Sequence, residues 1–69
     1  MPWRASKAKD VLAALLRIGW RVARQKGSHR RLVRDGWPPV TFAFHDGAEL
    51  GSAMLSKIAK DTGLEPEDL

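Results

Sequence analysis

The chain of 69 residues lacks cysteine, and this absence excludes several kinds of site at once. Disulfides, zinc sites built on thiolates and a cysteine nucleophile all require that residue. Only two histidines are present. Neither they nor the scattered carboxylates follow a metal-ligand spacing, so we expect no metal site.

Long apolar runs are also missing. The longest, Val11 to Leu16, is far shorter than the roughly 20 residues that cross a bilayer. Residues 1–6 lack the apolar centre of a signal peptide. We therefore expect a soluble, cytoplasmic protein with no membrane partner. So short a chain has room for one domain, residues 1–69, with 1–5 and 65–69 as loose ends.

Acidic residues are absent between Asp10 and Asp35, and this gap divides the charge of the chain. Residues 1–34 hold ten Lys and Arg against one acid, a net charge of +9, whereas residues 35–69 have a net charge of −5. A field this one-sided attracts a polyanion over long range. A surface that only keeps the protein soluble is the alternative, but the concentration of cations in one segment favours nucleic acid.

The apolar residues that are present predict two helices, one near each end of the chain. Ser6 is placed to cap an amphipathic helix over about residues 7–18, and Gly19 is placed to end it. A second apolar stripe predicts a helix that begins near residues 50–51 and ends at Gly63.

Between these helices the pattern changes to the alternation of strands. Residues 20–25 and 29–34 read as a hairpin, turned at residues 26–28. A wider turn over residues 35–39 leads to a third strand over residues 40–45. The order is therefore α-β-β-β-α. The predicted fold is α+β, a three-stranded antiparallel sheet with both helices on one face.

His29 is the strongest candidate for proton transfer in the basic half. An imidazole can take the proton of a ribose 2′-hydroxyl as that oxygen attacks the adjacent phosphorus, while Lys and Arg stabilise the charge on the phosphoryl oxygens. Such chemistry discriminates RNA from DNA. The residues expected to bind RNA are Arg24, Lys26, Gly27, Ser28, Arg30 and Arg31. The alternative is a polar surface histidine with no chemical role.

Other aromatic and imidazole side chains have weaker claims. His45, at the end of the predicted third strand, is a possible second acid–base group or a structural residue. Trp37, between a glycine and a proline, is expected to be exposed and to touch RNA or a partner protein, whereas Trp20 is expected in the core. Phe42 and Phe44 share a strand face and are also expected in the core.

Several short motifs along the chain match the pattern of a known family, in the same order. They are Lys9-Asp10-Val11-Leu12, Gly19-Trp20, Arg24-Gln25-Lys26-Gly27-Ser28-His29, Thr41, His45, Glu49-Leu50, Leu55, Ile58, Lys60, Gly63 and Leu64. In these residues the chain resembles the HicA family of small toxins, which are mRNA interferases that act beside a HicB antitoxin. Phe44 and Asp46 depart from the family pattern, which commonly has a proline and a basic residue there.

The resemblance implies a fold like that of double-stranded-RNA-binding domains. It also implies an endoribonuclease that cleaves mRNA without a cofactor, with His29 as the essential residue, and a HicB-type antitoxin that covers the site. The second proton carrier stays open among His45, a lysine and water. Two rivals also stay open: a non-catalytic RNA-binding module of the same fold, and an adaptor whose basic surface binds an acidic protein.

Overall fold

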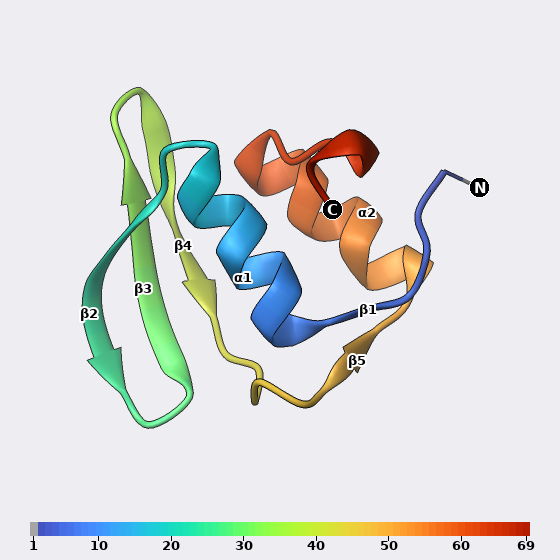
Figure 1. Ribbon diagram of the computed structural model, residues 1–69. Coiled ribbons are helices and arrows are strands. Elements are labelled where there is room, and N and C mark those ends of the chain that lie inside the picture. Colours follow the sequence, from blue (N-terminus) through green and yellow to red (C-terminus); the bar gives the residue numbers. More distant parts are fainter. Residues whose placement is uncertain (1) are drawn as a thin grey trace.

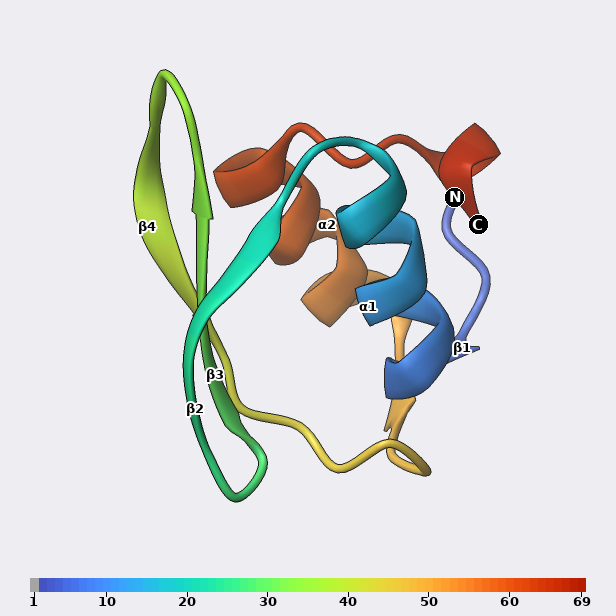
Figure 2. The ribbon, with the colours of Figure 1, turned by 60° about the vertical axis from the view of Figure 1, so that its left-hand side comes forward.

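The computed structural model describes residues 2–69 and has the predicted α+β architecture (Figure 1). Its elements are β1 (Ser6–Lys7), α1 (Ala8–Arg17), β2 (Arg21–Lys26), β3 (His29–Arg34), β4 (Trp37–Phe42), β5 (Glu49–Leu50), α2 (Ser52–Thr62) and a 3₁₀ turn, η1 (Pro66–Asp68). Strands β2, β3 and β4 form an antiparallel sheet in that order. Both helices lie on one face of this sheet, and no described element covers the other face (Figure 2).

The start of α1 differs from the prediction. The Ser6 hydroxyl donates to the carbonyl of Arg4 at 3.0 Å, and the residue before the helix, Lys7, makes no side-chain cap. The predicted capping role of Ser6 is therefore wrong. A backbone acceptor replaces it, because the N–H of Ala8 donates to the carbonyl of Ala48 at 2.8 Å.

Both helices end at a left-handed glycine, as predicted. Gly19 has φ +109°, and the following Trp20 N–H donates to the carbonyl of Leu15 at 3.1 Å. Gly63 has φ +77°, and its N–H donates to the carbonyl of Ala59. Over residues 2–69, no helix has both the length and the apolar character needed to cross a membrane.

Both turns of the sheet are shorter than predicted. Lys26 already pairs with His29, so the first turn is residues 27–28 rather than 26–28. Trp37 already pairs with Arg34, so the second turn is only residues 35–36. The wide turn predicted over residues 35–39 is therefore wrong. Pro38 and Pro39 lie in β4 where its register with β3 shifts, a position that tolerates residues without an N–H.

The third strand of the sheet ends earlier than predicted, at Phe42 rather than at His45. After β4 the chain turns toward α1, whose first N–H groups donate to the carbonyls of Asp46 and Ala48. It then forms β5, which pairs with β1 in a ladder of two residues a strand. The sequence analysis did not predict this small second sheet.

The core lies between the three-stranded sheet and the helices. Its buried hydrophobic residues are Ala8, Val11, Ala14, Leu15, Trp20, Leu32, Phe42, Leu50, Leu55, Ile58 and Leu64. The indole N–H of Trp20 donates to the carbonyl of Thr62 at 3.0 Å, which joins the end of α1 to the end of α2. Trp20 and Phe42 are thus in the core as predicted. Phe44 is half-buried, and its ring packs edge-on against Phe42 at 5.1 Å.

Residues from the two ends of the chain line one hollow, which includes Pro2 and Trp3 from one end and Pro66 and Leu69 from the other. Of the expected loose end at residues 1–5, Met1 is outside the described residues and Trp3 packs partly buried against the core. At the other end, Glu65 and Asp68 cap η1 reciprocally, and Arg17 donates to the carbonyl of Asp68 at 2.6 Å.

Candidate functional site

The open face of the sheet carries a cluster of cations around His29. Leu32 is fully buried toward the helices, so Arg30, two residues away, shares that inner face. His29 and Arg31 alternate with them and project from the open face. Across the ladders, His29 pairs with Lys26 on β2, whereas Arg31 pairs with Arg24 on β2 and with Thr41 on β4; all are exposed.

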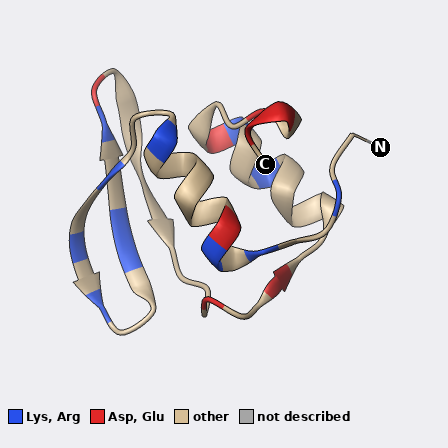
Figure 3. Cartoon of the chain, viewed as in Figure 1, with Lys and Arg blue, Asp and Glu red and all other residues tan. Residues whose placement is uncertain are grey.

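This arrangement forms a shallow depression of about 160 Å³. It is lined by Arg24, Lys26, His29, Arg30, Arg31 and Thr41. Five of these six residues were expected at the site from the sequence. Gly27 and Ser28 form the turn beside the depression and do not line it. Figure 3 shows the concentration of Lys and Arg along β2 and β3, whereas acidic residues gather elsewhere, at the end of α2 and in η1.

Thr41 is the lining residue that the sequence analysis did not propose as part of the site. Its hydroxyl accepts a hydrogen bond from Nη1 of Arg31 at 3.2 Å, which fixes that guanidinium against the sheet. The signal was present in the alternation of β4. Phe42 is buried, so its neighbour Thr41 points to the opposite, open face.

Arg30 differs from the other predicted RNA-binding residues. Its side chain is only 14% exposed, and Nη2 lies 3.3 Å from Oδ1 of Asp46 in an ion pair. Its Nη1 is buried and has no hydrogen-bond partner among residues 2–69. The guanidinium of Arg30 therefore holds the loop after β4 against the inner side of the sheet, while the residue contributes to the floor of the depression.

The imidazole of His29, by contrast, is accessible to a substrate. It is exposed at the first position of β3, and no described residue hydrogen-bonds to it. A basic ring and several cations thus converge on one hollow, an arrangement that suits an anionic substrate which must lose a proton.

Comparison with known families decides what kind of protein carries this site. Residues 8–64 match the model of the HicA toxin of bacterial toxin–antitoxin systems. This chain belongs to the HicA toxin family. A search of curated proteins finds no significant match. The match covers both helices and the whole three-stranded sheet, so it includes every residue of the depression.

Membership in the HicA family makes the chain a toxin of a toxin–antitoxin system. It supports endoribonuclease activity at the level of the family, with RNA as the target and an antitoxin as the partner. The family model does not assign roles to individual residues.

His45 and Trp37, the two accessory candidates in this HicA-family chain, both lie outside the depression. His45 is exposed on the loop after β4, and its carbonyl accepts the N–H of Ala48 at 2.9 Å. Trp37 is 38% exposed. Its ring meets Trp20 edge-on at 6.0 Å and lies 5.5 Å from the guanidinium of Arg34. Trp37 is therefore held by neighbours on its own side of the sheet.

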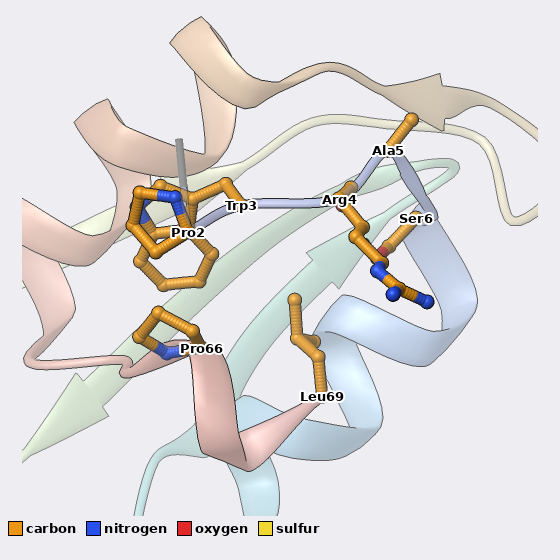
Figure 4. Close-up of a pocket in the computed structure, with 7 residues that line it drawn as sticks. All are labelled: Pro2, Trp3, Arg4, Ala5, Ser6, Pro66 and Leu69. Carbon is orange, nitrogen blue, oxygen red and sulfur yellow. The ribbon is translucent and has the colours of Figure 1, made fainter.

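A larger hollow of about 410 Å³ lies between the two ends of the chain (Figure 4). Pro2, Trp3 and Arg4 lie on one side of it and Pro66 and Leu69 on the other, and Arg4 is its one cation. Acidic η1 adjoins this hollow, where hydrogen bonding and repulsion from Glu67 raise the pKa of Glu65. A hollow that has one cation and lies beside an acidic turn does not suit a polyanion.

Proposed function

We propose that this chain is an mRNA-cleaving endoribonuclease toxin in which His29 carries the proton-transfer chemistry. The supporting observation is the depression that brings His29, Lys26, Arg24 and Arg31 onto the open face of the sheet. Membership in the HicA family supports the ribonuclease activity independently of that geometry, whereas the role of His29 rests on the geometry alone.

In the proposed reaction, His29 takes the proton of a ribose 2′-hydroxyl. The 2′ oxygen forms a bond to the adjacent phosphorus, and the bond from phosphorus to the 5′ oxygen of the next nucleotide breaks. That leaving oxygen takes a proton from water or from Lys26, which pairs with His29 across the hairpin. Arg24, Arg31 and Lys26 stabilise the charge on the phosphoryl oxygens. The products are a 2′,3′-cyclic phosphate and a free 5′-hydroxyl.

This mechanism assigns proton transfer to His29 together with Lys26 or water, and charge stabilisation to the cations of the depression. Arg30 forms part of the floor of the depression and does not bind phosphate directly, since its guanidinium forms an ion pair with Asp46. We further propose that a HicB-type antitoxin inhibits the toxin by covering the open face, and that the toxin meets its mRNA target in the cytoplasm.

The test is cleavage of a single-stranded RNA by the wild type, His29→Ala and His45→Ala. We expect His29→Ala to lower the rate by about 10²-fold or more, the usual contribution of a positioned acid–base group. His45→Ala is the matched control and should retain activity, because His45 lies outside the depression. Cleavage should persist in EDTA and leave a cyclic phosphate.

Two outcomes would overturn the proposal. Equal cleavage by the wild type and His29→Ala would remove His29 from the chemistry. If wild-type protein free of antitoxin binds RNA but cleaves none, the chain is the non-catalytic binding module.

A further inference from the structure

A groove runs along the outer edge of β4, where α2 packs beside the sheet. It consists of two adjoining hollows of about 540 and 190 Å³, which share Val40, Thr41, Lys57 and Asp61 as lining residues. Since the strand order is β2-β3-β4, β4 is an edge strand of this sheet. The groove is therefore open along its length.

Thr41 connects this groove to the depression that contains His29. It lines the depression and both hollows of the groove, so the three form one continuous surface around the edge of the sheet. Thr41 lies four positions along the strand from Trp37 at the far end, a distance of about 13 Å. A few nucleotides of an extended RNA strand fit this length.

The charge of the groove suits an anionic strand. Lys57 and Lys60 lie one turn apart on α2, and both are exposed and line the larger hollow. Asp61 is the one acid there, and neither lysine forms an ion pair with it in the described structure. Both ammonium groups are thus available to phosphate.

The rest of the lining suits bases better than a partner's β-strand. Trp37 and Val40 offer apolar surface in the larger hollow, and Met54 adds to it in the smaller one. Pro38 and Pro39 remove two N–H groups from this strand, which weakens any ladder that a protein strand can form with it. Aromatic and apolar surface beside cations is the usual composition of a single-strand binding groove.

We propose that the groove between β4 and α2 binds the single-stranded continuation of the RNA whose cleaved bond lies at His29. This inference rests on the proposed ribonuclease function. It assigns Lys57 and Lys60 to phosphates on one side of the cleaved bond, and it makes the toxin more active on RNA that is long enough to fill the groove.

The test uses RNAs with one cleavable ribose, the others being 2′-O-methylated. The RNAs are lengthened one nucleotide at a time on either side of the cleavable bond. For the wild type we expect kcat/KM to rise about tenfold over the dinucleotide when the RNA is extended on one side, and then to level off. The double variant Lys57→Ala/Lys60→Ala should lose most of this gain while it cleaves the dinucleotide at the wild-type rate.

The matched control is Lys7→Ala/Lys9→Ala, which removes the same charge from two exposed lysines outside the groove. It should keep the gain with length. If both double variants lose the gain with length equally, net charge explains the gain and the proposal is overturned. An unchanged gain in Lys57→Ala/Lys60→Ala, with weaker antitoxin binding instead, would make the groove a protein-docking site.

Failure of the proposed function is distinguishable from failure of this inference. If the wild type cleaves none of these RNAs, the ribonuclease proposal fails. The groove is then tested by the affinity for a fully 2′-O-methylated RNA, which needs no chemistry. There, a loss confined to Lys57→Ala/Lys60→Ala supports the groove, and its absence overturns it.

Discussion

Arg30 and Arg31 are adjacent in the sequence, yet their guanidinium groups have opposite surroundings. Arg31 lies on the open face and donates to Thr41, whereas Arg30 is largely buried against Asp46. The buried position of Arg30 gives Asp46 a structural task, since Asp46 is the one acceptor of its guanidinium among residues 2–69. An unpaired, largely buried cation is costly.

Replacement of Asp46 by alanine should therefore destabilise the fold. We expect the free energy of unfolding, measured by urea denaturation, to fall by about 1–2 kcal/mol, a value lowered because the Asp46 side chain is 65% exposed to solvent. Asp35→Ala is the control, because Asp35 is fully exposed and lies 4.0 Å from Arg21. It should leave the urea midpoint unchanged, and an equal loss in both variants would contradict the buried role of Arg30.

The C-terminal end of α2 depends on the absence of a side chain at Gly63. A Cβ at this position lies 2.9 Å from Cη2 of Trp37, and the backbone has φ +77°. Gly36 has a similar φ of +85° but open space around it. The two glycines thus separate the cost of the left-handed backbone from the cost of steric overlap.

Gly36→Ala should lower the free energy of unfolding by about 1–2 kcal/mol through the backbone alone. Gly63→Ala should lower it by about 2–5 kcal/mol, because overlap with a held tryptophan is added. Urea denaturation of both variants measures the difference. Equal losses would show that the Trp37 ring moves aside without cost.

The elements that the sequence predicted well are those with local signals. The apolar stripe and the terminal glycine located α1, and the turn signal at residues 26–28 located the hairpin. The β1–β5 ladder has only two residues a strand and joins segments more than 40 positions apart, so no local pattern indicates it. The same holds for the contact of the loop after β4 with the first N–H groups of α1.

Most residues of the candidate site can be predicted from the sequence, provided that the alternation of side chains along each strand is used. The sequence identified His29 and the cations around it, and alternation against buried Leu32 and Phe42 separates Arg30 from Arg31 and brings in Thr41. The contact of Arg30 with Asp46 and the groove beside α2 require the three-dimensional path of the chain. Local sequence carries no sign of either.

At the scale of the whole molecule, the opposite charges of the two halves are brought into a compact body with principal extents of 31 × 26 × 17 Å. The cations of the first half concentrate on the sheet, and the acids of the second half lie mainly in the C-terminal region (Figure 3). The proposed RNA site is therefore a cationic face although the net charge is only +4.

The salt dependence of RNA affinity measures how many cations of this face contact phosphates. For His29→Ala and a short RNA, contacts to Arg24, Lys26 and Arg31 predict a slope of log affinity against log salt concentration of about −2. A longer RNA that also reaches Lys57 and Lys60 should steepen the slope to about −3.5. Fluorescence anisotropy across a salt series measures both slopes.

The variants test which contact each part of the slope reports. Because each contact releases its own counterions, Arg31→Ala should flatten both slopes by about 0.7, whereas Lys57→Ala/Lys60→Ala should flatten only the longer RNA's slope. One slope for both RNAs would mean that binding ends at the open face.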